Sequence, residues 1–217
     1  MRNIIKIGTR PSALALKQIE EIKRLLPRFN LEVIPIKTRG DKDKVSILSD
    51  NEESDFFTYE IEQALLGGHI DAGVHSAKDL ERDMPDGLVV AATTPSISPF
   101  ECLVSRGNLT LEKLPGGAIV GTSSRKRKEA VSRFRPDLVV KYIRGNIDER
   151  LKRLDEGEFD AIIIAHAAMI RLGLEHRIAE IIPEKIIKPH SLQGRLAVQI
   201  RKDRDDLLKI FRSLDEQ

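Results

Sequence analysis

Short apolar runs alternate with longer amphipathic stretches along the chain, a pattern typical of β-α-β units. Apolar runs of about four to eight residues predict buried strands, whereas apolar positions three or four residues apart predict helices. The expected strands are 4–8, 31–37, 70–75, 101–105, 118–121, 139–143 and 160–165. The expected helices are 12–26, 58–66, 123–134, 147–154, the stretch after residue 165 up to 172, and 203–214. The pattern therefore predicts an α/β fold.

Turn residues separate the expected elements, and the chain is expected to form two structural units. Pro27 ends the first expected helix, and Gly67-Gly68 closes the second. The charge-rich segment 41–55 is expected to form a mobile loop. A second unit begins after 88–94, and 217 residues are enough for one large domain or two small ones.

Composition narrows the class of protein. Hydrophobic residues make up 41% of the chain and charged residues 32%, which suits a packed core with a solvated surface. The 36 basic and 34 acidic residues leave a net charge of +2, which argues against bulk binding of nucleic acid or of an anionic membrane. A single cysteine, Cys102, favours a reducing compartment, and no apolar run approaches the roughly 20 residues of a membrane span. We therefore expect a cytoplasmic protein without a signal peptide.

Polar side chains gather where the expected strands end, which is the edge at which parallel α/β sheets bind ligands. These junctions share hydroxyls, arginines and lysines, the chemistry of an anion site. They are Thr9-Arg10, Thr38-Arg39, His75–Asp79, Thr122–Arg127 and Arg144–Asn146.

The junction 121–127 lies between a strand and a helix, where hydroxyl caps and the helix dipole favour a carboxylate or a phosphate. The alternative is an ordinary N-cap followed by a solvated basic face, and the spacing is not that of a P-loop. Arg144, followed by Arg150, is a second candidate for anion binding at a strand end. The alternative is that these arginines are ordinary surface charges. Arg10 and Ser12 either face the same sheet edge or only cap the first helix.

The segment 75–79, His-Ser-Ala-Lys-Asp, follows a buried strand without a turn signal. Asp79 is a candidate general base, or an anion that stabilises a positive intermediate. The alternative is a surface pair with Lys78. His75 is better interpreted as a structural histidine, and Cys102 as an inert buried thiol. No spacing resembles a metal site.

Several segments together resemble hydroxymethylbilane synthase, also called porphobilinogen deaminase, in order and spacing. They are IGTRPSALALKQ, TRGD, TYEIEQALLGGHIDAGVHSAKDL, ECLVS, IVGTSSRKRK, RGNIDERLKRLDEGEFDAIIIAHAAMIRLGL and SLQGRLAVQI. They extend from Ile7 to about Ile200.

The resemblance implies two domains that resemble type II periplasmic binding proteins, with the active cleft between them. The first would comprise 1–94 and 190–217, and the second 95–189. It also implies a transferase of porphyrin and haem biosynthesis, which joins four porphobilinogen units head to tail with loss of ammonia on a dipyrromethane primer. Porphobilinogen is the expected partner of a monomer that binds neither nucleic acid nor membrane.

The resemblance assigns roles residue by residue. Asp79 takes the catalytic carboxylate role. Residues that match positions binding the cofactor or the substrate carboxylates are Arg10, Ser12, Lys78, Thr122, Ser123, Ser124, Lys126, Arg127, Arg144, Arg150 and Gln193. Lys126 stands where the family usually has arginine, so the charge survives but bidentate pairing is lost.

The sequence also departs from the family pattern. Glu53-Ser54-Asp55 and Tyr59 stand where the family has a glycine-lysine-glycine loop and a further lysine, and 167–168 and 193–195 differ by smaller changes. The family usually continues into a third domain whose cysteine anchors the dipyrromethane. Cys102 does not align with that cysteine, so no covalent cofactor site is identified here.

Two functions therefore remain open. One is an active synthase whose primer is held non-covalently or by a separate third-domain chain. The other is a non-catalytic module that binds pyrrole carboxylates or other anions. Asp79 favours the synthase, because a binder of acidic ligands gains nothing from a carboxylate. A nucleic-acid protein acting through 125–128 does not fit the near-neutral charge.

Overall fold

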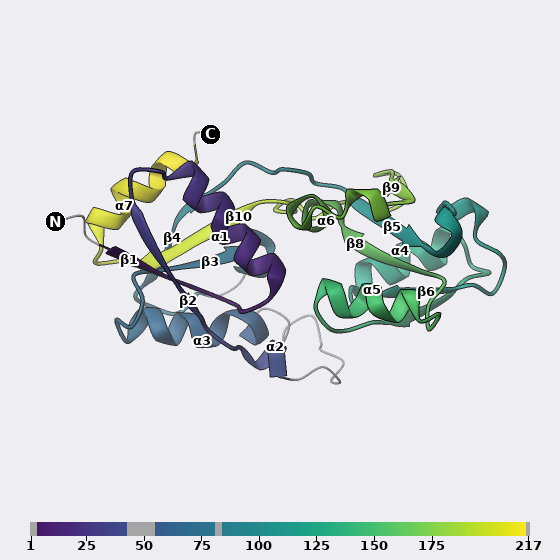
Figure 1. Ribbon diagram of the computed structural model, residues 1–217, viewed down its shortest axis with the longest axis horizontal. Helices are drawn as coiled ribbons and strands as arrows, with labels where there is room; N and C mark the ends of the chain where they lie inside the picture. The colour runs from purple at the N-terminus through teal and green to yellow at the C-terminus, as the bar shows by residue number, and fades with distance from the viewer. Residues whose placement is uncertain (1–3, 43–54, 81–83, 216–217) are drawn as a thin grey trace. The chain divides into compact units, whose positions relative to one another are not determined.

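The structure is a computed structural model that describes residues 4–42, 55–80 and 84–215 (Figure 1). The chain divides into two compact units, which we call unit 1 and unit 2. Unit 1 comprises Met1–Ile97 and Gly194–Gln217, and unit 2 comprises Ser98–Gln193. Each unit contains one five-stranded sheet, so the expected α/β class is confirmed.

The sheet of unit 1 has the order β2-β1-β3-β10-β4. Its strands are β1 (Ile4–Thr9), β2 (Asn30–Pro35), β3 (Ala72–Ser76), β4 (Leu88–Thr93) and β10 (Leu196–Arg201). β1 runs parallel to β2 and β3, whereas β10 runs antiparallel to β3 and β4. The sheet is therefore mixed rather than parallel. The sequence pattern did not predict β10, which returns to this sheet after the chain has formed all of unit 2.

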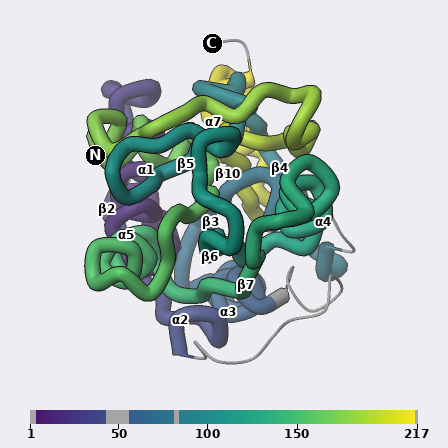
Figure 2. The backbone as a smooth tube through the Cα atoms, turned by 90° about the vertical axis from the view of Figure 1, so that its right-hand side faces the viewer, coloured from purple at the N-terminus to yellow at the C-terminus, as the bar shows by residue number. Residues whose placement is uncertain are grey.

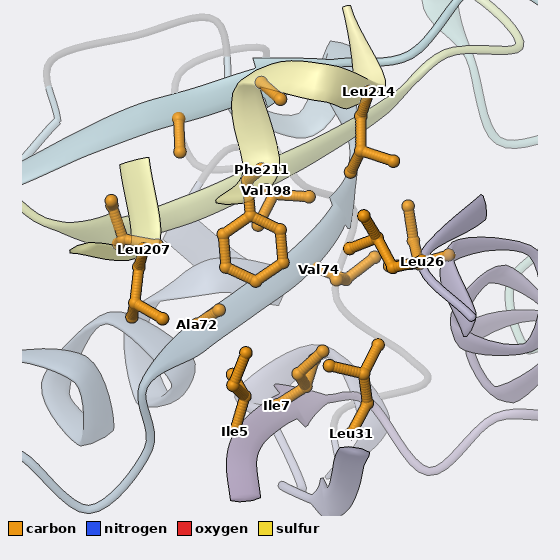
Figure 3. Close-up of a cluster of buried hydrophobic side chains, with 14 of the residues drawn as sticks. Ile5, Ile7, Leu26, Leu31, Ala72, Val74, Val198, Leu207, Phe211 and Leu214 are labelled. Atoms are coloured by element: carbon orange, nitrogen blue, oxygen red, sulfur yellow. The ribbon is translucent and has the colours of Figure 1, made fainter. Parts of the chain in front are cut away.

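Helices cover both faces of this sheet (Figure 1). α1 (Ala13–Leu25) and α7 (Asp205–Phe211) lie on one face, and α3 (Asp55–Leu66) lies on the other. Figure 3 shows the core beneath α7, where the Phe211 ring packs among aliphatic side chains of α7 and of the sheet. Phe211 is fully buried, so the C-terminal helix belongs to the core of unit 1.

The sheet of unit 2 has the order β7-β6-β8-β5-β9. Its strands are β5 (Glu101–Ser105), β6 (Ile119–Thr122), β7 (Val139–Tyr142), β8 (Ala161–Ala165) and β9 (Glu180–Ile182). β6 runs parallel to β7 and β8, and β5 runs antiparallel to β8. β9 is a three-residue strand that was not predicted, because it is too short to show a period.

α4 (Arg125–Phe134) and α5 (Ile147–Asp155) flank β6 and β7 (Figure 2), and α6 (His166–Leu172) follows β8 directly. Val131 of α4 packs into the core on one face of the sheet. The short helices are α2 (Arg39–Lys42), η1 (Ala77–Leu80), η2 (Arg106–Asn108), η3 (Leu111–Lys113), η4 (Glu175–Arg177) and η5 (Arg212–Leu214). No helix in the described ranges is both long enough and apolar enough to cross a membrane.

The expected loop at 41–55 needs a correction at both ends. Residues 39–42 form α2, and α3 begins at Asp55, three residues before the predicted start at Thr58. The segment 43–54, which includes Glu53 and Ser54, lies outside the described residues. The helix expected from Ser123 begins at Arg125, because Ser124 is its N-cap.

Candidate functional site

The parallel strands of unit 1 end at one edge, where side chains from β1, α1, α3, β3 and η1 line a pocket. Three predicted site residues, Arg10, Ser12 and Asp79, are among its lining residues. Ser12 is the N-cap of α1 and accepts a hydrogen bond from the N–H of Ala15, at 3.3 Å. The carboxyl edge of the sheet thus collects polar groups, as the strand-end rule predicts.

Asp79 reaches this pocket because the backbone tightens after β3. The strand ends at Ser76, and residues 77–80 form a single 3₁₀ turn. The Ala77 N–H donates to the carbonyl of Arg195 on the returning chain, at 3.0 Å. The Gln18 amide of α1 donates to the Ser76 hydroxyl, at 3.1 Å. These bonds anchor the turn from two sides, and Lys78 lies within the same turn.

Arg10 is held by a carboxylate that the sequence pattern did not single out. Asp41 Oδ1 accepts from Nε and from Nη2 of Arg10, at 3.1 and 2.5 Å. Its other oxygen accepts from the backbone N–H and the hydroxyl of Thr38, both at 3.0 Å. The Arg10 guanidinium also lies 4.2 Å from the centre of the Phe57 ring. Arg10 is therefore fixed in place before any ligand binds, with part of its charge already compensated.

The Arg10–Asp41 pair makes stability depend on pH. Burial raises the pKa of Asp41, but hydrogen bonds from Arg10 and Thr38 outweigh it and leave the pKa below the usual value. A lowered folded pKa means that this stabilisation is complete above the unfolded pKa and is lost as the pH falls through the folded one. We expect Asp41→Asn to reduce the free energy of unfolding by about 1–2 kcal/mol at pH 7. In urea titrations, the difference in the free energy of unfolding between the wild type and Asp41→Asn should become smaller below about pH 4. A difference that stays constant with pH would contradict this assignment.

The parallel strands of unit 2 bring a second group of predicted residues together. Nη1 of Arg150 donates to the Ser123 hydroxyl at 3.1 Å, and its Nε donates to the Gly145 carbonyl at 2.8 Å. Ser124 caps α4, and its backbone N–H donates to the Thr122 hydroxyl at 3.3 Å. The loops after β6 and β7 are thus joined through one guanidinium. Arg144 lies in the second of these loops.

Gly145 allows this approach. Its φ is 106°, and a Cβ there would lie 2.7 Å from the Glu149 carboxylate. That carboxylate forms a capping box with Asn146, which starts α5. A side chain at 145 would therefore disturb both the turn and the cap.

Arg127 has a different environment from its neighbours. It is buried, and its guanidinium pairs with the buried Glu101 carboxylate of β5, with an Nε–Oε1 distance of 2.8 Å and an Nη2–Oε2 distance of 2.7 Å. Lys126, one residue earlier, is exposed. Of these two predicted anion-binding residues, Arg127 is thus already paired inside unit 2.

The remaining predicted residue and two departures from the pattern are also placed. Gln193 is buried in the turn that ends unit 2, and its N–H donates to the His190 carbonyl at 2.9 Å. Tyr59 carries the Arg39 guanidinium 4.0 Å above its ring. Arg195 donates to the Thr94 carbonyl at 3.3 Å.

The structure also places Cys102 and the side chains that could ligate a metal ion. Burial, together with the charge of Glu101, raises the pKa of the Cys102 thiol to about 12, so the thiol stays protonated at neutral pH. Among the described residues, no group of three or more His, Cys, Asp or Glu side chains could hold a metal ion.

Comparison with known proteins assigns a family to this arrangement. Residues 5–209 match the family model described as "Porphobilinogen deaminase, dipyromethane cofactor binding domain". The chain belongs to the porphobilinogen deaminase family. A porphobilinogen deaminase of Brevibacillus brevis is 39% identical over 97% of this chain and 70% of its own length. That of Geobacillus kaustophilus is 41% identical over 100% and 72%. The family comprises transferases of tetrapyrrole biosynthesis and uses a dipyrromethane cofactor.

Solved structures agree with the predicted fold. A nutrient-binding protein from Burkholderia cenocepacia bound to methionine has a TM-score of 0.57 and 15% identity, covering 97% of this chain and 91% of that one. An ancestral arginine-binding protein bound to arginine has a TM-score of 0.52 and 19% identity, covering 100% and 92%. The expected likeness to two-domain, type II periplasmic binding proteins is confirmed at the level of fold.

Proposed function

We propose that this chain is a hydroxymethylbilane synthase, which condenses four porphobilinogen units head to tail with loss of ammonia. The observation that carries the proposal is the position of Asp79, which lines a pocket together with Arg10 and Ser12. A site that only bound acidic ligands would lose affinity by placing a carboxylate there. The carboxylate is useful where a positive charge develops during the reaction.

Asp79 has a defined task in each condensation. The bond between the aminomethyl carbon and nitrogen breaks, ammonia leaves, and an electron-poor azafulvene with a positive pyrrole nitrogen remains. The Asp79 carboxylate stabilises that charge in the pocket wall. The methylene carbon then bonds to the free α-carbon of the next pyrrole, which loses its proton. One carbon–nitrogen bond is thus exchanged for one carbon–carbon bond.

Carboxylate binding is assigned to two groups of donors, one in each unit. Each pyrrole carries an acetate and a propionate, which suit hydroxyls, guanidinium groups and a capped helix start. The group in unit 1 is Arg10, Ser12 and Lys78. The group in unit 2 is Thr122, Ser123, Ser124, Lys126, Arg144, Arg150 and Gln193. Arg127 is paired with Glu101 and is expected to support this group.

These donors also fit a dipyrromethane cofactor, whose acidic arms need the same chemistry. The Ser123 hydroxyl and the Arg150 guanidinium, already in contact, and the exposed Lys126 are its expected ligands in unit 2. When bound, the cofactor supplies the pyrrole end from which the chain grows. Because the Cys102 thiol stays protonated, we do not expect it to anchor the cofactor.

One observation favours the alternative, a binding module without turnover. Arg10 and Arg127 are paired with Asp41 and Glu101, and Tyr59 stands where the family pattern described above has a lysine. Fewer cations are then available to hold a growing chain of carboxylates. Such a module would bind anionic pyrroles and leave porphobilinogen unchanged.

Turnover separates the two functions. The purified protein is incubated with porphobilinogen, with and without a supplied dipyrromethane primer, and substrate loss and oxidised uroporphyrin are followed. We expect both signals to depend on enzyme concentration. Absence of both, in a preparation that still binds the primer by calorimetry, would support the binding module instead. Intact mass before and after incubation shows whether any primer is covalently attached.

A further inference from the structure

A layer of buried polar side chains lies on the α3 side of the unit 1 sheet. His75 of β3, Gln199 of β10 and Glu62 of α3 are 5%, 0% and 6% exposed. The Gln199 amide Nε2 donates to Glu62 Oε1 at 3.0 Å, a contact between residues 137 positions apart. Buried polar groups persist where they are hydrogen-bonded, so this layer needs a complete set of partners.

Strand register places His75 beside Gln199. β10 pairs antiparallel with β3, so that Gln199 lies opposite Gly73, two residues before His75. Gly73 leaves the room that the imidazole occupies, because a Cβ on Gly73 would lie 2.9 Å from His75 Nε2. The ring therefore sits over a glycine and next to the Gln199 side chain, while it also forms part of the wall of the Asp79 pocket.

The amide has a defined direction. Its N–H group faces Glu62, so its carbonyl oxygen is left to accept a hydrogen bond. In the described part of the chain, Gln199 Oε1 and His75 Nε2 are both buried without a close partner. Gln199 Oε1 is an acceptor, and His75 Nε2 becomes a donor when it carries the ring proton. The two atoms can therefore satisfy each other.

We propose that Gln199, oriented by Glu62, is a positioning residue that holds His75 as the neutral imidazole with its proton on Nε2. Nδ1 is then the acceptor on the ring that lines the Asp79 pocket. The role in turnover rests on the synthase function proposed above. His75 adds a neutral acceptor beside Asp79 rather than a cation. This part of the pocket therefore selects N–H donors of the substrate, and the acidic arms bind elsewhere.

The surroundings of His75 support a neutral ring. Burial lowers the pKa of His75 to about 4, and the neighbouring Gln199 side chain raises it in part. Within the described ranges, Arg10 and Asp79 are the charged residues that line the pocket together with His75, and Glu62 on α3 accepts from Gln199. The neutral Gln199 amide separates the imidazole of His75 from the Glu62 carboxylate. The Nε2 proton of His75 is therefore held by an amide oxygen and not by a carboxylate.

Histidine NMR tests the proposal without any turnover. The protein is labelled with ¹⁵N-histidine, and the His75 signals are assigned by their absence in His75→Gln. We expect a neutral ring protonated on Nε2 between about pH 5.5 and 8. Protonation on Nδ1, or a midpoint above about pH 6, would overturn the proposal in the wild-type protein itself.

Two variants of Gln199 then test what the amide contributes. Gln199→Glu places a carboxylate beside the ring, so the His75 midpoint should rise by at least about one pH unit. Gln199→Met keeps the size but removes both hydrogen bonds, so it should mix the tautomers without adding an ionisation. Unchanged His75 shifts in both variants would exclude Gln199 as the positioning residue.

The dependence of turnover on pH tests whether the positioning of His75 matters for catalysis. In Gln199→Glu, turnover should fall about tenfold as the pH drops through the raised midpoint, because the ring loses its acceptor. Gln199→Met should show no such step. A wild-type protein with the expected tautomer but without turnover would refute the synthase function and leave the positioning of His75 intact.

Discussion

Replacing Asp79 by Asn is expected to lower the turnover of porphobilinogen by roughly 10²- to 10³-fold. The substitution keeps the size of the side chain and removes the negative charge. The pocket then lacks the charge that stabilises the positive azafulvene nitrogen. Because Asn is neutral, affinity for acidic pyrroles should hold or rise. The loss should therefore appear in kcat and not in KM, measured by uroporphyrin formation.

Asp86→Asn is the matched control, since Asp86 is an exposed carboxylate of the same unit, outside the pocket lining. Its turnover should equal that of the wild type. Thermal melts of both variants should agree with the wild type within a few degrees. If Asp79→Asn retained wild-type kcat, the carboxylate would have no part in the chemistry.

The second large effect is expected in unit 2, where Glu101→Gln should cost about 3–5 kcal/mol of unfolding free energy. The substitution leaves the Arg127 guanidinium buried without its counter-charge. The side chains of this pair are only 10% and 6% exposed, so water cannot compensate the charge. Urea unfolding followed by circular dichroism measures the loss. Binding of a dipyrromethane primer should weaken as well, because Arg127 supports the first turn of α4 beside Ser124 and Lys126.

Two further variants show whether the cost comes from burial. Lys152→Gln breaks an exposed pair with Glu156, 3.7 Å apart, and should change stability by less than about 0.5 kcal/mol. The double variant Glu101→Leu with Arg127→Met should recover most of the lost stability, because no charge is left buried. Equal stabilities of Glu101→Gln and Lys152→Gln would show that Arg127 can reach solvent.

The sequence by itself determined the features that depend on neighbouring residues. Ser12, Ser124 and Asn146 start helices because a short side chain can bond backbone N–H groups two or three residues ahead. The apolar residues 102–104 and 161–165 predicted buried strands at 101–105 and 160–165, and both strands form. The polar segment after β3 indicated a functional edge, because the end of a buried strand has a known place in an α/β sheet.

Tertiary structure alone decided which basic side chains are already paired with a carboxylate. Arg10 is paired with Asp41, 31 residues away, and Arg127 with Glu101, 26 residues away. Nothing in a local pattern distinguishes them from the exposed Lys126. The antiparallel return of β10 also depends on partners more than 100 residues earlier, and it brings Gln199 beside His75. The type of each residue thus set the chemistry available, while distant chain segments brought together by folding decided how each charge and hydrogen bond is used.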